Sequence, residues 1–378
     1  MNRAFYAAHN DTGPPRWGVV CTCREPTQLV VAFAAHYIGL GASEVRLYLD
    51  QRQPDLEAIL DRIPQVVFHV CDAAYWRDHI GRPRPESVEY RQLINAFDAY
   101  HGSQVDWLAH FDADEFLHAD IPVADILRAQ PNEIEYAVVE PRERAFVQGV
   151  RQTELFDGVF RQPTPALWGN APFLFGGAQR FLRQGVLSYP HGKSFMRTGK
   201  PLLPGIHTPR RPAAHRRLKL RGWAVQRMRL LHFDGLTSLH WSGKLLRAAA
   251  AGGDKHHTRK QSRDTHRAKQ IIRMRKLGAN LQNARDMHEM LKCVPQDQLA
   301  RLRALAVLED YTIDPAKDIA ALGLDVKVDL SRAAFDRALA DHTPQVADWL
   351  AEWEALMAPG PPHMAADEHR VSPVLWGS

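Results

Sequence analysis

The first 111 residues alternate short apolar runs with amphipathic segments, and this alternation limits the folds open to the chain. Residues 17–22 read WGVVCT, a valine-rich run between Pro15 and Pro26 that is typical of a fully buried strand. The alternation continues with strands predicted at 45–49, 66–70 and 107–111 and helices predicted at 27–38, 56–63 and 86–100. Such β-α-β units predict an α/β fold, a mostly parallel sheet flanked by helices.

The alternation is lost beyond the fourth strand. Residues 141–205 are rich in proline and glycine and predict short strands and loops. Residues 244–356 carry Ala, Leu, Arg and Glu at helical spacing, which predicts a helical C-terminal portion. We therefore expect an α/β domain over 1–243, a helical region over 244–358 and a disordered tail over 359–378.

Composition excludes several classes of protein. With 45% hydrophobic and 24% charged residues among 378, the chain has the make-up of an ordinary globular protein. No run of 18 apolar residues occurs, and the N-terminus lacks the apolar stretch of a secretory signal. Four scattered cysteines do not form a disulfide framework. We expect a cytoplasmic protein.

Charge is distributed unevenly along the chain. Residues 105–157 contain 12 acidic and 4 basic side chains, whereas residues 192–231 contain 11 Lys or Arg and no acid. This predicts a metal-binding acidic region and a phosphate-binding basic region, with two solvated faces as the alternative. The basic stretch is also a candidate for peripheral contact with a membrane surface. Its part from Arg210 to Arg229 has one aromatic residue for base stacking, Trp223, so we expect no nucleic-acid partner.

The strongest functional signal is the segment FDADEF, residues 111–116, which follows the fourth predicted strand. In an α/β sheet, ligands bind at the carboxyl ends of strands. On extended backbone, the carboxylates of Asp112 and Asp114 would point the same way. Hard cations such as Mg²⁺ or Mn²⁺ take oxygen ligands of this kind, and burying unpaired acids is costly. These residues predict a metal site, with a solvated turn as the alternative.

Together with the first strands, this segment resembles a known family. Arg24-Glu25 after the first strand, Ala35-His36-Tyr37 in the first helix, a second strand that ends in Asp50, and DADEF at 112–116 are similar to family 2 type glycosyltransferases. The likeness is to a bacterial branch with a D-x-D-E-F signature, and it covers about residues 16–250. The chain departs from that pattern at Arg24, where Asn is usual, and at Tyr37, where a second His is common.

The resemblance implies a GT-A fold and an inverting, metal-dependent transfer of a sugar from a nucleotide-diphosphate sugar to a hydroxyl group. The acceptor would be a glycan, a polysaccharide or a lipid-linked molecule, and the cofactor Mn²⁺ or Mg²⁺. Carried over by position, Glu25 and Asp50 would contact the nucleoside, Asp112 the ribose or the metal, and Asp114 the metal. A cation that neutralises the leaving diphosphate would lower the barrier.

The remaining site residues are less sharply defined. Lys193 and Lys244 are candidate phosphate ligands, and a surface lysine is the alternative for Lys244. His232 is the candidate third metal ligand, with a buried histidine bonded to a carbonyl as the alternative. An inverting transfer needs a carboxylate base, and residues 158–233 contain no acid. Glu140, Glu143, Glu154, Asp157 and Asp234 are therefore the candidates for the base, and Glu140 and Asp234 come first among them.

Three other classes of protein compete with this interpretation. A nucleotidyltransferase has a related sheet and also binds a metal on a nucleotide. Such enzymes usually carry a glycine-rich basic loop after the first strand, where this chain has Cys23-Arg24-Glu25-Pro26. A nucleic-acid-binding protein and a catalytically inactive scaffold are the further alternatives.

Overall fold

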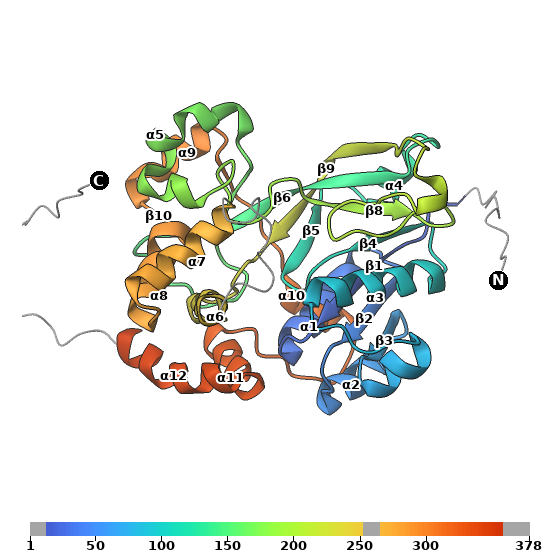
Figure 1. Ribbon diagram of the computed structural model, residues 1–378, viewed down its shortest axis with the longest axis horizontal. Coiled ribbons are helices and arrows are strands. Elements are labelled where there is room, and N and C mark those ends of the chain that lie inside the picture. The colour runs from blue at the N-terminus through green and yellow to red at the C-terminus, as the bar shows by residue number, and fades with distance from the viewer. Residues whose placement is uncertain (1–12, 252–264, 358–378) are drawn as a thin grey trace, which may run out of the picture.

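The structure is a computed structural model that describes residues 13–251 and 265–357 (Figure 1). The expected tail at 359–378 lies outside these ranges. The strands are β1 (Trp17–Cys23), β2 (Glu44–Leu49), β3 (Val66–Val70), β4 (Trp107–His110), β5 (Glu115–Ala119), β6 (Tyr136–Val147), β7 (Val159–Arg161), β8 (Lys193–Arg197), β9 (Gly222–His232), β10 (Cys293–Val294) and β11 (Leu308–Glu309).

The α-helices are α1 (Thr27–Gly39), α2 (Pro54–Leu60), α3 (Val88–Gly102), α4 (Val123–Arg128), α5 (Ala171–Phe175), α6 (Ser238–Ala250), α7 (His266–Leu277), α8 (Leu281–Lys292), α9 (Leu299–Ala304), α10 (Pro315–Ala321), α11 (Arg332–His342) and α12 (Pro344–Met357). Short helical turns are η1 (Tyr75–His79), η2 (Pro165–Asn170), η3 (Gly176–Phe181), η4 (Ala213–His215) and η6 (Gln296–Gln298).

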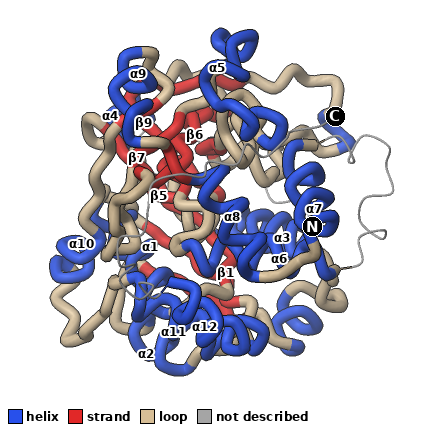
Figure 2. The backbone as a smooth tube through the Cα atoms, turned by 90° about the vertical axis from the view of Figure 1, so that its left-hand side faces the viewer, coloured by secondary structure: helices blue, strands red, loops and turns tan. Residues whose placement is uncertain are grey.

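The strands form one sheet in the order β11-β7-β6-β8-β4-β1-β2-β3, and β5, β9 and β10 pair off this path. β1 runs parallel to both β2 and β4, and β2 runs parallel to β3, as the β-α-β alternation predicted. β8 is antiparallel to β4 and to β6. Helices surround this sheet (Figure 2). The α/β fold with a parallel core flanked by helices is confirmed.

Helix α1 is buried on every side. All residues from Leu29 to Tyr37 are buried, because one face packs on the sheet and another is covered by α10 from the C-terminal region. His36 joins these layers: its Nδ1 lies 3.0 Å from Asp318 Oδ2, and its Nε2 lies 2.8 Å from the carbonyl oxygen of Leu117. The apolar stripe of α1 therefore indicated one buried face, and the tertiary structure buries the others.

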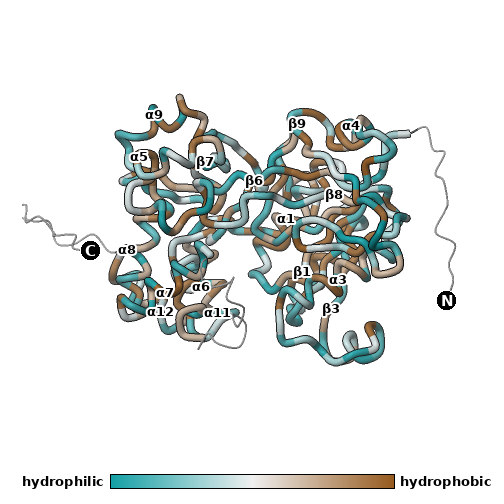
Figure 3. Tube along the Cα trace, turned by 45° about the horizontal axis from the view of Figure 1, so that its top comes forward, coloured by the Kyte–Doolittle hydropathy of each residue, from teal (hydrophilic) through white to brown (hydrophobic). Residues whose placement is uncertain are grey.

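The C-terminal region is helical, and it also contributes to the sheet. β10 pairs with β6 and β11 pairs with β7. Figures 1 and 3 show two lobes that β6 connects, with α7, α8, α11 and α12 in one and β1, β3 and α3 in the other. The domain boundary expected after residue 243 falls inside α6 (Ser238–Ala250). None of the helices in the described parts of the chain has both the length and the hydrophobicity needed to cross a membrane.

Candidate active site

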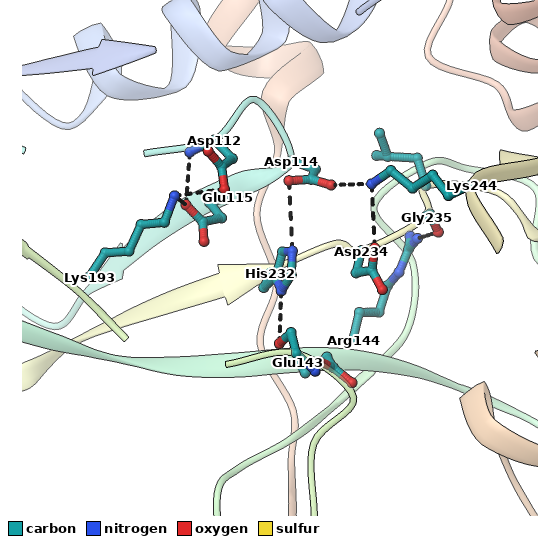
Figure 4. Close-up of polar contacts among 12 residues, drawn as sticks. Asp112, Asp114, Glu115, Glu143, Arg144, Lys193, His232, Asp234, Gly235 and Lys244 are labelled. Atoms are coloured by element: carbon teal, nitrogen blue, oxygen red, sulfur yellow. Dashed lines mark hydrogen bonds and ion pairs between the residues drawn. The ribbon is translucent and has the colours of Figure 1, made fainter. Parts of the chain in front are cut away.

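The acidic segment after β4 forms a tight turn into β5. The backbone N–H of Glu115 donates to the carbonyl oxygen of Asp112, and the backbone N–H of Asp112 donates to Glu115 Oε2 at 2.8 Å. Because the backbone turns here, the carboxylates of Asp112 and Asp114 face different partners. They do not point the same way, as they would on extended backbone. Figure 4 shows Asp112 near Lys193 and Asp114 near His232 and Lys244.

Asp114 belongs to a cluster of metal-ligand type with His232 and Asp234. Each of the three offers one ligand atom, and these atoms lie within 4.8 Å of one another. The register of the antiparallel pair β5 and β9 creates the cluster, because Glu115 lies opposite His232. The residue before β5 therefore meets the end of β9 and the residues that follow it. The structure thus places Asp234, a sequence candidate for the base, among the candidate metal ligands.

Lys244 supplies the positive charge beside this cluster. Its Nζ lies 3.0 Å from Asp114 Oδ2 and 3.4 Å from Asp234 Oδ1. Burial alone would raise the pKa of Asp114, but the charges of Lys244 and His232 outweigh burial and hold that pKa below its usual value. The pKa of Asp234 is lowered further, against the effect of burial, by Lys244 and Lys292. Both carboxylates are therefore ionised near neutral pH and available to a cation.

The donor set fits a divalent cation. Two carboxylates and one imidazole suit Mn²⁺, and carboxylates suit Mg²⁺. His232 Nε2 lies 3.7 Å from Asp114 Oδ1, while its Nδ1 contacts Ser188 Oγ at 3.1 Å. A hydrogen bond on the second ring nitrogen orients a histidine ligand. Lys244 has a flexible side chain that is 31% exposed, so its ammonium group can move towards a phosphate when a cation binds the acids.

Asp112 and Lys193 form a second charged group with Glu115. Lys193 Nζ lies 2.7 Å from Asp112 Oδ2 and 2.8 Å from Glu115 Oε2, and its side chain is 2% exposed. Lys193 is therefore the buried counter-ion of two carboxylates in this structure. Burial raises the pKa of Glu115 to about 7 although Lys193 is adjacent. The pKa of Asp112 is lowered instead, because Lys193 outweighs the effect of burial there.

A glycine is required in the turn that leads to Lys193. Gly192 has φ +69°, and a Cβ built on it would lie 1.9 Å from the carbonyl oxygen of Val139. The close approach of this turn to β6 lets β8 begin at Lys193, with the ammonium group under the acidic turn.

Glu25 and Asp50 lie at the carboxyl ends of β1 and β2. The pKa of Glu25 is raised by burial, and the charges of Asp114 and Lys244 also act on it, which places Glu25 beside the cluster. Asp50 Oδ2 accepts from Arg84 at 2.9 Å and Arg91 at 2.8 Å. Its Oδ1 is buried and has no hydrogen-bond partner among the described residues.

A cavity of about 730 Å³ opens next to Asp50. Cys71 and Trp76 line it together with Arg52 and Arg84. The cavity lies at the carboxyl ends of β2 and β3, two neighbouring strands of the parallel section. Ligands of α/β sheets bind at the carboxyl ends of strands.

Glu140, the other of the first two sequence candidates for the base, has a side chain that is 54% exposed and 3.6 Å from Arg142. A register irregularity between Val139 and Glu140 marks its position in β6. Within the described residues, neither a hydrogen bond nor an ion pair joins Glu140 to the Asp114 cluster. The sequence also offers His256 and His257 for a lid or for contact with the acceptor, with a plain solvated loop as the alternative, and both lie outside the described residues.

Ser188 was missed in the sequence, and the roles that the structure gives to Glu115 and to Glu143, one of the candidate bases, were not recognised there. Glu115 was read only as part of the acidic segment, although it shares Lys193 with Asp112. Glu143 accepts hydrogen bonds from the backbone N–H groups of Leu187 and Ser188, at 2.8 and 2.7 Å, and so holds Ser188 against His232. No local pattern marks Glu143 or Ser188, because their roles depend on strand pairing.

Comparisons with known proteins give partial structural likeness. No protein-family model matches the chain, and no curated protein matches it. Among solved structures, the WbbM bifunctional glycosyltransferase aligns at 14% identity and TM-score 0.24, over 35% of this chain and 24% of WbbM. This chain therefore spans about a quarter of that protein.

Two further solved structures align over more of the chain. Glucosyl-3-phosphoglycerate synthase from Mycobacterium tuberculosis, in complex with Mn²⁺, UDP-glucose and phosphoglyceric acid, aligns at 13% identity and TM-score 0.28, over 62% of this chain and 79% of that one. TarS 1–349 from S. aureus aligns at 9% identity and TM-score 0.28, over 89% and 92%. TM-scores this low assign no role to any residue of this chain.

Proposed function

We propose that the chain is a metal-dependent glycosyltransferase of GT-A type that uses a nucleotide-diphosphate sugar and a hydroxyl acceptor on a glycan or a lipid-linked molecule. The observation that carries the proposal is the cluster of Asp114, His232 and Asp234, whose ligand atoms lie within 4.8 Å of one another. It stands at the strand-end edge of the sheet, with a lysine on two of its acids. This is the arrangement that a cation-bound diphosphate requires.

Each part of the site has a place in this proposal. Asp114, His232 and Asp234 would hold the cation, which would act as a Lewis acid on the diphosphate. The ammonium group of Lys244 would move from the two acids to the leaving diphosphate and contact its negative charge. The cavity beside Asp50 would receive the nucleoside, and Glu25 would lie between the cavity and the metal site. Asp112 and Glu115, neutralised by Lys193, would fix the turn that carries Asp114.

Binding of a nucleoside diphosphate is expected to require Mn²⁺ or Mg²⁺. Without the cation, Asp114 and Asp234 would repel the diphosphate. Isothermal calorimetry of UDP and GDP, with Mn²⁺ and then with excess EDTA, measures this directly. Unchanged affinity in EDTA would contradict the proposal. Release of pyrophosphate from a nucleoside triphosphate would instead indicate a nucleotidyltransferase.

The transfer is expected to invert the anomeric carbon. Asp234 belongs to the metal cluster in this proposal, and a carboxylate bound to a cation is a poor proton acceptor, so it is not assigned as the base. Inversion rests on the family resemblance and predicts a β-linked product from an α-linked nucleotide sugar. Proton NMR of the first product formed reads the linkage, and an α-linked first product would overturn inversion.

A further inference from the structure

A basic surface lies in the loop before β9 and at the start of that strand, which we call the basic loop (residues 210–223). Five of its cations are exposed and take part in no ion pair within the described parts of the chain: Arg210, Arg216, Arg217, Lys219 and Arg221. Arg227 follows on β9 and is also exposed. The sequence between residues 158 and 233 contains no acid that could neutralise them locally.

The basic loop has a defined shape because Arg211 holds it from within. The Arg211 guanidinium donates to Glu135 Oε2 at 2.5 Å, to the carbonyl oxygen of Lys219 at 3.0 Å and to that of Pro201 at 3.3 Å. Where the loop joins β9, Gly222 lies directly on the ring of Tyr136, at a distance that no side chain would allow. Arg211 and Glu135 are thus paired with each other, and the remaining cations of the basic loop face solvent.

Two large apolar side chains project among these cations. Leu218 is 53% exposed and Trp223 is 62% exposed. Trp223 borders a groove of about 440 Å³ between α4 and β9, which Ile121, Ile126 and Val225 also line. Figure 1 shows α4 beside β9. Asp125, the acid of this groove, is paired with Arg128.

We propose that the basic loop docks the protein on an anionic lipid bilayer. Lys and Arg residues at a membrane surface attract acidic headgroups. Exposed Trp and Leu residues gain free energy by entering the headgroup region, and Trp favours that boundary. Nucleic acid is the less favoured occupant, since single-strand binding uses several aromatic side chains for stacking and this surface exposes only Trp223 within the described residues. The inference does not depend on the proposed sugar transfer.

Vesicle co-sedimentation of the full chain tests the proposal. We expect binding to phosphatidylcholine vesicles that contain about one third phosphatidylglycerol, weak binding to pure phosphatidylcholine, and loss of binding as salt rises. Arg216→Glu with Arg217→Glu should weaken the partition at least about tenfold, because each basic residue near such a surface contributes about fivefold. Leu218→Ala with Trp223→Ala should also weaken it, through lost insertion.

The matched control is Arg273→Glu with Lys276→Glu on α7, which makes the same change in net charge at two exposed positions of the other lobe. This control should bind vesicles like the wild type. Circular dichroism melting confirms that each variant is folded. Three results would each overturn the proposal. They are an equal loss of vesicle binding in the control, no binding to anionic vesicles, and tight RNA binding that is unchanged by Leu218→Ala with Trp223→Ala.

Discussion

Asp114→Ala is expected to abolish sugar transfer while the protein stays folded. Asp114 offers the central carboxylate of the cluster, between His232 at 3.7 Å and Lys244 at 3.0 Å. The charge stabilisation by a catalytic metal is worth several kcal/mol, so turnover should fall by roughly 10³-fold or more. The fold should survive, because Lys244 keeps Asp234 as a partner at 3.4 Å.

Asp120→Ala is the matched control, because it removes an aspartate at the other end of β5. Asp114 directly precedes β5 and Asp120 directly follows it, and the side chain of Asp120 is 56% exposed. Asp120→Ala should keep both Mn²⁺-dependent UDP binding and turnover. Calorimetry with Mn²⁺ and UDP, together with a donor-hydrolysis assay, measures both variants. An active Asp114→Ala protein would remove Asp114 from the metal site.

Lys193→Met is expected to lower the free energy of unfolding by about 3–5 kcal/mol at pH 7.5. Methionine keeps most of the side-chain volume but leaves Asp112 and Glu115 without their shared counter-ion. Breaking a buried ion pair by removing one partner has a cost of this size. Urea unfolding measures the loss, and Lys276→Met, an exposed lysine of α7, is the control that should change little.

The deficit of Lys193→Met should shrink as pH falls from 7.5 to 5. The pKa of Glu115 is about 7 in the folded protein, above its unfolded value, so folding takes up a proton between those two values. At pH values above this window, Glu115 is charged in the folded protein and lowers its stability. At pH values below the window, Glu115 is protonated and has no such effect. Removing Lys193 raises the pKa of Glu115 further, so lowering the pH protonates the carboxylate that has lost its counter-ion. A deficit that is constant or grows towards pH 5 would show that Lys193 acts otherwise.

The elements of the first 111 residues could be predicted because they depend on local sequence. Apolar runs marked β1 to β4, and helical spacing marked α1, since burial of these patterns is needed in any arrangement. The acidic turn after β4 could also be found, because three acids directly follow a buried strand. These features identify candidate residues, although they leave open which of them meet.

Which residues meet was decided by strand pairing across long stretches of chain. His232 and Asp234 reach Asp114 only because β9 pairs antiparallel with β5 in one register. Lys193, predicted as a phosphate ligand, is enclosed by Asp112 and Glu115 because β8 pairs with β4 beside the turn. Register depends on which face of each strand is buried against distant partners, and a sequence pattern records burial without recording the partner. The sequence by itself determined the parallel core and the acids at its edge, and the tertiary structure decided their grouping into a metal-type cluster and a buried ion pair.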